Sequence, residues 1–335
     1  MKRVLIHGFG SIGQRHLRVI SELDPNLEIA VLSEHGSHAR AANAPGRLFK
    51  GLEQARAFQP DAVVVANAAV AHVAAASGWL QAGAHVLVEK PLASSTEHLD
   101  ALLALAQSSG RVLQVGYNLR QAPGLRLMRE WCEQGRLGRI LSARLEVGQN
   151  LAGWRAGTDL RTSVSAQRAM GGGVLLELSH EIDYLQWLLG PVDWVSAQLF
   201  RLGSWDIDVE DTAFLTLGMT RPGHGVASLQ MDFVRHDSTR QCTLVGELGS
   251  LRWNAMAGTL QVHHAGAEGW STLQHIVPER DATYRAQWQA FAAACSGLSP
   301  VPADAEDGAL VVRVVEAARR SAELSGQRVS LKRPE

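Results

Sequence analysis

Residues 3–17, RVLIHGFGSIGQRHL, decide the fold of the first part of this chain. A short apolar run predicts a buried strand, and Gly8, Gly10 and Gly13 then form the pattern G-x-G-x-x-G at the start of a helical segment. The first glycine permits a tight turn, the second lets a pyrophosphate approach the backbone, and the third lets the helix pack on the strand. Unpaired N–H groups at the helix start then face the phosphates. The predicted dinucleotide contacts in this turn are Gly8, Phe9, Gly10, Ser11, Ile12 and Gly13.

The end of the second predicted strand, LEIAVLSEH at 27–35, bears on the type of dinucleotide. An acid about 20 residues after the glycines binds the ribose hydroxyls of NAD, and Glu34 stands at about that place. Ser33, Ser37 and Arg40 lie nearby and offer groups for a 2′-phosphate. The sequence therefore favours NAD(H) and leaves NADP(H) open, with a solvated loop acid as the alternative interpretation of Glu34.

Length and composition limit the class of protein. A chain of 335 residues with 46% hydrophobic residues predicts about two globular domains. Thirty-two basic and 33 acidic residues nearly cancel, so no charge surplus points to nucleic acid or an anionic membrane, and no apolar run is long enough to span a bilayer. Cys132, Cys242 and Cys295 are too scattered for a disulfide framework or a cysteine zinc site. We expect a globular protein of the reducing cytoplasm.

The pattern of the chain changes near residue 120. Before it, short Val- and Ile-rich runs alternate with Ala- and Leu-rich helical segments, which predicts a parallel sheet with helices on both faces over residues 1–120. After it, strand-like stretches separated by short turns predict an α+β domain with an antiparallel sheet over residues 121–335. Two helices close the chain, and we expect the second, over 305–325, to pack back on the first domain.

The stretch HVLVEKPLA, residues 85–93, places a lysine at the end of a buried strand. In an open parallel sheet the carboxyl ends of the strands face the ligand crevice. Lys90 at that edge can donate to a substrate hydroxyl and stabilise the alkoxide, or polarise a carbonyl in the reverse direction. The alternative is a surface lysine beside a turn.

The stretch GGGVLLELSHEIDY, residues 171–184, concentrates a histidine with several acids. In one continuous helix Glu177, His180, Asp183 and Tyr184 would share a face. A metal site is one interpretation, but Tyr184 stands where H-E-x-x-H needs its second histidine, so we predict no metal.

An ordinary helix start is another interpretation of the same stretch. Ser179 is a suitable N-cap and Glu181 a suitable first-turn acid. Neither explains the histidine, whose unperturbed pKa near ~6.5 suits proton transfer at neutral pH. We therefore interpret His180 as a proton carrier.

A loop-like segment, LAGWRAGTDLRTSVS at 151–165, precedes the glycines. Trp154, Arg155 and Arg161 are candidates to hold the ring face, carboxylate or phosphate of a substrate. The alternative is a surface loop that packs on its own domain.

Taken together and in this order, the motifs resemble the Gfo/Idh/MocA oxidoreductase family over essentially the whole chain. VGYNLR at 115–120, VEDTAFLTL at 209–217 and the closing stretch from 302 to 326 add to the glycine turn, EKP and the 171–184 segment. The resemblance implies a Rossmann domain followed by a domain with a large, mostly antiparallel sheet, whose exposed face supports homodimers or homotetramers. It also implies an NAD(P)-dependent dehydrogenase or reductase of sugars, amino sugars, sugar nucleotides or polyols.

Site residues of the first domain follow from the resemblance by position. Lys90 would lie beside the nicotinamide and the substrate, with Glu89 among the cofactor contacts. Asn67 and His72 in NAAVAH would contact the cofactor, although the proline usual in this turn is missing. The remaining substrate contacts in this region would be Tyr117, Asn118 and Arg120.

For the second domain the resemblance implies an acid and a histidine around the substrate hydroxyl. His180 matches the family's histidine, and Glu177 matches its acid when counted from the glycines. The spacing is three instead of the usual four, and the acid is Glu instead of Asp. Either Glu177 or Asp183 is therefore expected to orient His180.

The mechanism that we expect is a hydride transfer between a sugar-like secondary alcohol and C4 of the nicotinamide. His180 takes the hydroxyl proton and Lys90 hydrogen-bonds the same oxygen. Two alternatives remain: a lyase or glycosidase-like enzyme that uses tightly bound NAD without net redox, and a silent NAD(P)-binding regulator.

Overall fold

The computed structural model describes residues 1–33, 47–154, 163–220 and 225–331. It divides into two compact units, one made of Met1–Asn118 with Arg280–Ala309 and the other of Leu119–Glu279 with Leu310–Glu335. The domain boundary expected at residue 120 stays a prediction, and the structure adds that residues 280–309 belong to the first unit. No helix within the described ranges is both long and apolar enough to cross a membrane.

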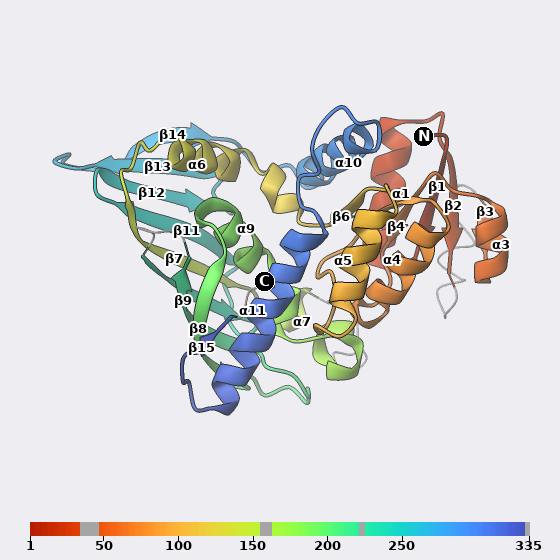
Figure 1. Ribbon diagram of the computed structural model, residues 1–335. Helices are drawn as coiled ribbons and strands as arrows, with labels where there is room; N and C mark the ends of the chain where they lie inside the picture. Colours follow the sequence, from red (N-terminus) through yellow and green to blue (C-terminus); the bar gives the residue numbers. More distant parts are fainter. Residues whose placement is uncertain (34–46, 155–162, 221–224, 332–335) are drawn as a thin grey trace. The chain divides into compact units, whose positions relative to one another are not determined.

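The first unit is built on a six-stranded parallel sheet with the order β3-β2-β1-β4-β5-β6 (Figure 1). Its strands are β1 Arg3–His7, β2 Glu28–Leu32, β3 Arg47–Phe49, β4 Ala62–Val65, β5 His85–Val88 and β6 Leu113–Val115. The strand order reverses direction between β1 and β4, which both pair in parallel register. A reversal of this kind leaves a crevice at the carboxyl ends of the two strands, where ligands bind in open α/β sheets.

Helices cover this sheet because their apolar stripes match its faces. Helix α1 (Ser11–Leu23) buries Gly13, His16, Leu17 and Ile20, which recur at helical spacing, and it packs beside α10 (Ala282–Cys295). Trp288 and Phe291 of α10 join the same core as β1 and β4. A fully buried Phe side chain contributes about 1.5–3 kcal/mol to folding. The remaining α-helices in the described residues of this unit are α3 Leu52–Ala57, α4 His72–Gln81 and α5 Leu99–Ser108.

The second unit is built on a nine-stranded sheet with the order β14-β13-β12-β11-β7-β10-β9-β8-β15 (Figure 1). Its strands are β7 Ile140–Gly148, β8 Val192–Phe200, β9 Thr212–Met219, β10 Val226–Asp232, β11 Thr239–Gly246, β12 Gly249–Asn254, β13 Thr259–His264, β14 Ser271–His275 and β15 Val329–Ser330. Neighbouring strands are antiparallel except β7 and β10, which pair in parallel. Both predicted fold classes, α/β and then α+β with a mostly antiparallel sheet, are confirmed.

One face of the nine-stranded sheet carries helices (Figure 1). Helix α6 (Pro123–Glu133) packs on β12 and β13, and α9 (His180–Leu189) packs beside α6. The other short helices of this region are α7 Leu151–Trp154 and α8 Val174–Glu177, while α11 (Ala305–Glu323) begins in the first unit and continues in the second. The opposite side of the sheet includes exposed large side chains, with Phe214 at 42% and Val226 at 44% exposure.

Candidate functional site

The glycine turn after β1 has the geometry that its sequence predicts. Gly8 has a φ of +104°, and a Cβ there would lie 2.6 Å from the backbone of Ala66 and Asn67. A Cβ on Gly13 would collide with the carbonyl oxygen of Gly8. Gly10, in contrast, has no heavy atom within 4 Å of its Cβ position. Gly8 and Gly13 are therefore required by the fold itself, while Gly10 keeps a space open at the start of α1.

Polar groups around this space fit a dinucleotide. The first turn of α1 receives no hydrogen bond from a side-chain cap, so its N–H groups are available to phosphate oxygens. Asn67 Oδ1 is buried and has no hydrogen-bond partner in the described part of the chain. Phe9 and Ile12 point their side chains into the core, so only their backbone can contact a cofactor.

Most of the residues that could distinguish NAD from NADP lie outside the described ranges. Glu34, Ser37 and Arg40 are among them, whereas Ser33 is buried and its N–H donates to the carbonyl of Phe49 at 3.1 Å. The choice between the two dinucleotides through Glu34 stays a prediction.

Glu89, just after β5, forms a buried pair with a histidine of the glycine-turn helix. His16 Nε2 lies 2.6 Å from Glu89 Oε1, and the two side chains are 1% and 8% exposed. The other carboxylate oxygen accepts the N–H of Lys90 at 3.2 Å. Burial favours a higher pKa for Glu89, but the hydrogen bond and charge of His16, with Lys90, outweigh it, so the pKa of Glu89 lies below its usual value. The pair connects α1 to the turn that carries Lys90.

His16 is a site residue that the sequence motifs did not single out, although a signal for it exists. It follows Gly13 by three residues and shares the buried stripe of α1, where a polar side chain needs a partner. The structure thus gives Glu89 an internal partner, and its predicted contact with a cofactor stays a prediction.

The His72 ring contacts two backbone carbonyls of the protein, and its predicted contact with a cofactor stays a prediction. The ring is 1% exposed, and its two nitrogens face backbone carbonyls: Nδ1 lies 2.7 Å from Pro91 O and Nε2 lies 3.1 Å from Asn67 O. The Lys90–Pro91 peptide bond is cis. His72 therefore joins the loop after β4 to the turn after β5.

The segment 171–184 is not one helix, so the predicted single face is wrong. Helix α8 ends at Glu177, Leu178 leaves helical geometry with φ −102° and ψ 26°, and α9 begins at His180. Ser179 precedes α9, but its hydroxyl accepts no capping hydrogen bond from the backbone N–H groups of the helix. Glu177 therefore does not belong to the face of α9 that carries Asp183, and its Oε1 accepts a hydrogen bond from the Ser165 hydroxyl at 3.1 Å.

Asp183 is held by a buried arginine. Arg120 Nε donates to both carboxylate oxygens of Asp183 at 3.2 and 3.0 Å, and Arg120 Nη2 donates to Oδ1 at 2.6 Å. The side chains are 4% and 1% exposed. The described contacts thus place Arg120 in support of α9, whose first residue is the buried His180. The predicted substrate contact of Arg120 stays a prediction without support from these contacts.

Glu181 is in the first turn of α9, as the sequence predicts, but its side chain also forms a buried ion pair. It is fully buried, and Arg240 Nε of β11 donates to its Oε1 at 2.8 Å. Burial, followed by the charge of Glu181, holds the pKa of Tyr184 well above its usual value. The Tyr184 ring packs edge-on against Trp253 of β12. The Glu181–Arg240 ion pair and the packing of Tyr184 on Trp253 together fix α9 against the sheet.

The other predicted substrate contacts are only partly described. Tyr117 is 2% exposed, and Asn118 donates through Nδ2 to the Thr283 hydroxyl at 2.8 Å. Arg155 and Arg161 lie outside the described residues, and for Trp154 only its place at the end of α7 is described.

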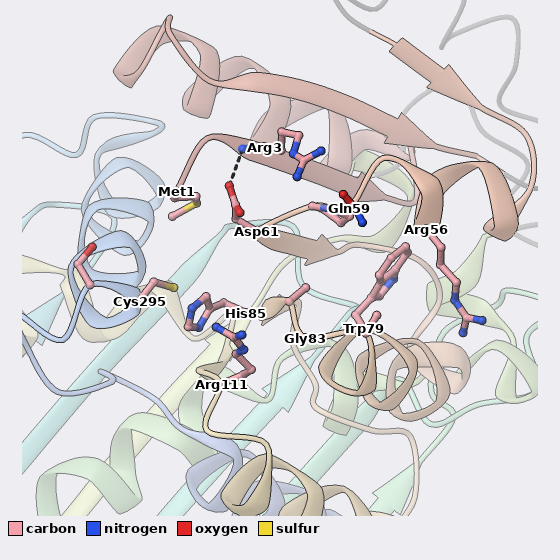
Figure 2. Close-up of a pocket in the computed structure, with 14 residues that line it drawn as sticks. Met1, Arg3, Arg56, Gln59, Asp61, Trp79, Gly83, His85, Arg111 and Cys295 are labelled. Atoms are coloured by element: carbon pink, nitrogen blue, oxygen red, sulfur yellow. Dashed lines mark hydrogen bonds between the residues drawn. The ribbon is translucent and has the colours of Figure 1, made fainter.

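A cavity of about 560 Å³ in the first unit lies at the opposite edge of the sheet from the glycine turn. Figure 2 shows Arg3, Asp61, His85 and Arg111 around it, and the Arg3 N–H donates to Asp61 at 2.9 Å. Helices α3, α4 and α10 end at this edge, and their carbonyl ends attract cations. Since Asp61 and these carbonyls offset the arginines, we assign no ligand to this cavity.

A metal site needs several acid, histidine or cysteine side chains close together. Within the described ranges, no group of three or more His, Cys, Asp or Glu side chains is placed to hold a metal ion.

Comparison with known proteins covers both units. Residues 2–117 match the Gfo/Idh/MocA model described as an oxidoreductase family with an NAD-binding Rossmann fold, and residues 125–252 match the Gfo/Idh/MocA C-terminal domain. Inositol 2-dehydrogenase 2 of Saccharopolyspora erythraea is 30% identical over 94% of this chain and 91% of its own length.

Solved structures share the fold over nearly the full length. GenD2 from gentamicin A biosynthesis, solved in complex with NAD, has a TM-score of 0.83 and 26% identity, covering 99% of this chain and 97% of its own. The WlbA dehydrogenase of Bordetella pertussis, solved with NADH and UDP-GlcNAcA, has a TM-score of 0.82 and 24% identity, covering 99% of each chain.

Proposed function

The chain belongs to the Gfo/Idh/MocA family of NAD-binding oxidoreductases, and we propose that it is an NAD(H)-dependent dehydrogenase of a sugar, amino sugar, sugar nucleotide or polyol. The observation that carries the proposal is the open glycine turn after β1, together with Lys90 after the carboxyl end of β5 in the same parallel sheet. Similarity to an inositol dehydrogenase over most of both chains supports a secondary alcohol as the reacting group.

The residues of the first unit fit the cofactor. The backbone of Gly8–Gly13 and the start of α1 would hold the pyrophosphate, and Asn67 would donate or accept through its side-chain amide. The bound dinucleotide supplies the hydride acceptor or donor. Use of NADP(H) in place of NAD(H) is the alternative that a direct comparison of both cofactors decides.

Two side chains carry the proton chemistry in this proposal. The Lys90 ammonium donates a hydrogen bond to the reacting oxygen and stabilises the negative charge that develops there. His180, as a neutral imidazole, accepts the hydroxyl proton. Asp183 supports His180 through the backbone of α9, because its carboxylate is bound to Arg120. Glu177 is the other candidate for this support.

The test is a screen of sugars, polyols and sugar nucleotides with NAD and with NADP, followed by the absorbance of the reduced cofactor. With the best substrate, Lys90→Met and His180→Ala are expected to lower kcat/KM by about 10²–10⁴-fold. Lys50→Met and His236→Ala, at exposed positions, are matched controls and should keep wild-type turnover. A loss of less than tenfold in either test variant would show that the residue has no such role.

We also propose a cytoplasmic homo-oligomer that associates through the exposed side of the nine-stranded sheet. Phe200 and Phe214, at 39% and 42% exposure, pack edge to face there and offer apolar area for a second copy. Light scattering after size exclusion should give a dimer or tetramer, and Phe214→Lys should dissociate it. A monomeric wild type would refute this part.

A further inference from the structure

The turn that carries Lys90 is anchored on both sides. Before it, Glu89 is tied to α1 through His16 at 2.6 Å, and the Glu89 N–H donates to Val65 O at 2.9 Å. After it, the Pro91 carbonyl lies 2.7 Å from His72 Nδ1. The lysine therefore stands between two fixed backbone points.

The second anchor also reaches the loop after β4. His72 begins α4, and its Nε2 lies 3.1 Å from the carbonyl oxygen of Asn67. Both neighbours of the ring are carbonyl oxygens, which only accept hydrogen bonds, while a neutral imidazole donates only one. Burial lowers the pKa of His72, which favours the neutral ring. The neutral ring can therefore donate to only one of the two carbonyls, and we assign the donated hydrogen bond to Pro91, because that contact is the shorter.

We propose that His72 is a positioning residue, which fixes the backbone of the Lys90–Pro91 turn by donating its Nδ1–H to the Pro91 carbonyl and thereby places the Lys90 ammonium. This inference rests on the proposed function, because it takes Lys90 as the group that contacts the reacting oxygen.

The reason for such an anchor lies in the local chain. β5 ends at Val88, and Pro91 has no N–H with which its turn can be tied by its own backbone. Lysine has a long, flexible stem, so only its backbone can limit where the ammonium lies. A displacement of about 1 Å at a reacting group can lower the rate by about 10²-fold.

Two variants separate the two contacts of the ring. In His72→Asn the side-chain amide nitrogen takes the place of Nδ1 and keeps the bond to Pro91. In His72→Gln it takes the place of Nε2 and keeps the contact with Asn67. With the substrate found in the screen, we expect His72→Asn to keep kcat within about threefold and His72→Gln to lower kcat by about tenfold or more, with little change in the Kd of NADH.

His85→Asn is the matched control. His85 lies at the amino end of β5, and its Nδ1 accepts the Val112 N–H at 3.0 Å, a role that an Asn side-chain oxygen can fill. It should keep the wild-type kcat. Equal kcat values for His72→Asn and His72→Gln would overturn the inference, and so would a change in the Kd of NADH without a change in kcat.

A measurement on the wild-type protein keeps the inference testable if a variant does not fold. The ¹⁵N spectrum of histidine-labelled full-length protein should show His72 as the Nδ1–H tautomer, and an Nε2–H tautomer would overturn it. This readout needs no activity. If Lys90→Met keeps full turnover, the proposed function fails, whereas loss in Lys90→Met with equal His72 variants refutes only the positioning role.

Discussion

Asp183→Asn should destabilise the second unit strongly, because it leaves a charged guanidinium buried without its counter-ion. Three hydrogen bonds join Arg120 to Asp183, and neither side chain exceeds 4% exposure. Solvent therefore does little to replace the lost carboxylate. Breaking a buried pair by removing one partner costs about 3–5 kcal/mol. For a domain of this size each kcal/mol lowers Tm by roughly 2–4 °C, so the expected fall is roughly 6–20 °C.

Urea unfolding followed by tryptophan fluorescence measures this loss, since Trp187 and Trp253 lie in the same unit. Glu323→Gln is the control, because its pair with Arg320 is exposed (64% and 67%) and such pairs contribute about 0–1 kcal/mol. Arg120→Met with Asp183→Leu should recover most of the stability, since an apolar pair leaves no buried charge. A loss below about 1 kcal/mol in Asp183→Asn, or no recovery in the double variant, would refute the reasoning.

Three further predictions concern the first unit and the thiols. Gly10→Ala should keep the free energy of unfolding within about 0.5 kcal/mol yet weaken NADH binding at least tenfold, whereas Gly8→Ala should lower the free energy of unfolding itself. If the two variants changed the calorimetric Tm and the Kd of NADH to the same extent, this reasoning would be contradicted. The pKa of Glu89 is lower in the folded than in the unfolded protein, so its pair with His16 stabilises the fold fully above the unfolded pKa of about 4.3. This stability is lost as the pH falls through the folded pKa. Glu89→Gln should therefore reduce the fall of the urea midpoint at acid pH, and an unchanged fall would exclude the contribution of the pair. Burial raises the pKa of Cys132 and of Cys295 to about 12, and that of Cys242 further. At pH 8 the thiolate fraction is then about 10⁻⁴ or lower, so a thiol reagent should label all three cysteines only after unfolding. Rapid labelling of the native protein would disprove this.

Local features of the fold could be predicted because neighbouring residues determine them. Gly8 and Gly13 are needed by contacts within or directly beside the turn, so the spacing alone predicts their role. The α/β and α+β halves follow from hydrophobic periodicity, which adjacent positions carry. The short edge strand β14 was missed because its side chains are mostly exposed and show no alternation.

Long-range pairs could not be predicted from one sequence. Glu181 is a first-turn acid by position, but its buried ion pair is with Arg240, 59 residues further along the chain. Arg120 and Asp183 are 63 residues apart, so the arginine resembled a substrate contact. The break between α8 and α9 has neither Gly nor Pro at Leu178 and Ser179, and periodicity therefore suggested one helix.

The division of the chain constrains how such a protein can be recombined. Helix α10, which brings Trp288 and Phe291 to the core beside α1, lies far along the chain from the strands that it covers. A fragment that ends at Asn118 would lack this helix and leave apolar surface of α1 in water. Exchange of the cofactor-binding half between homologues by a single crossover would therefore produce a mismatched core, and chimaeras need α10 to travel together with the first 118 residues.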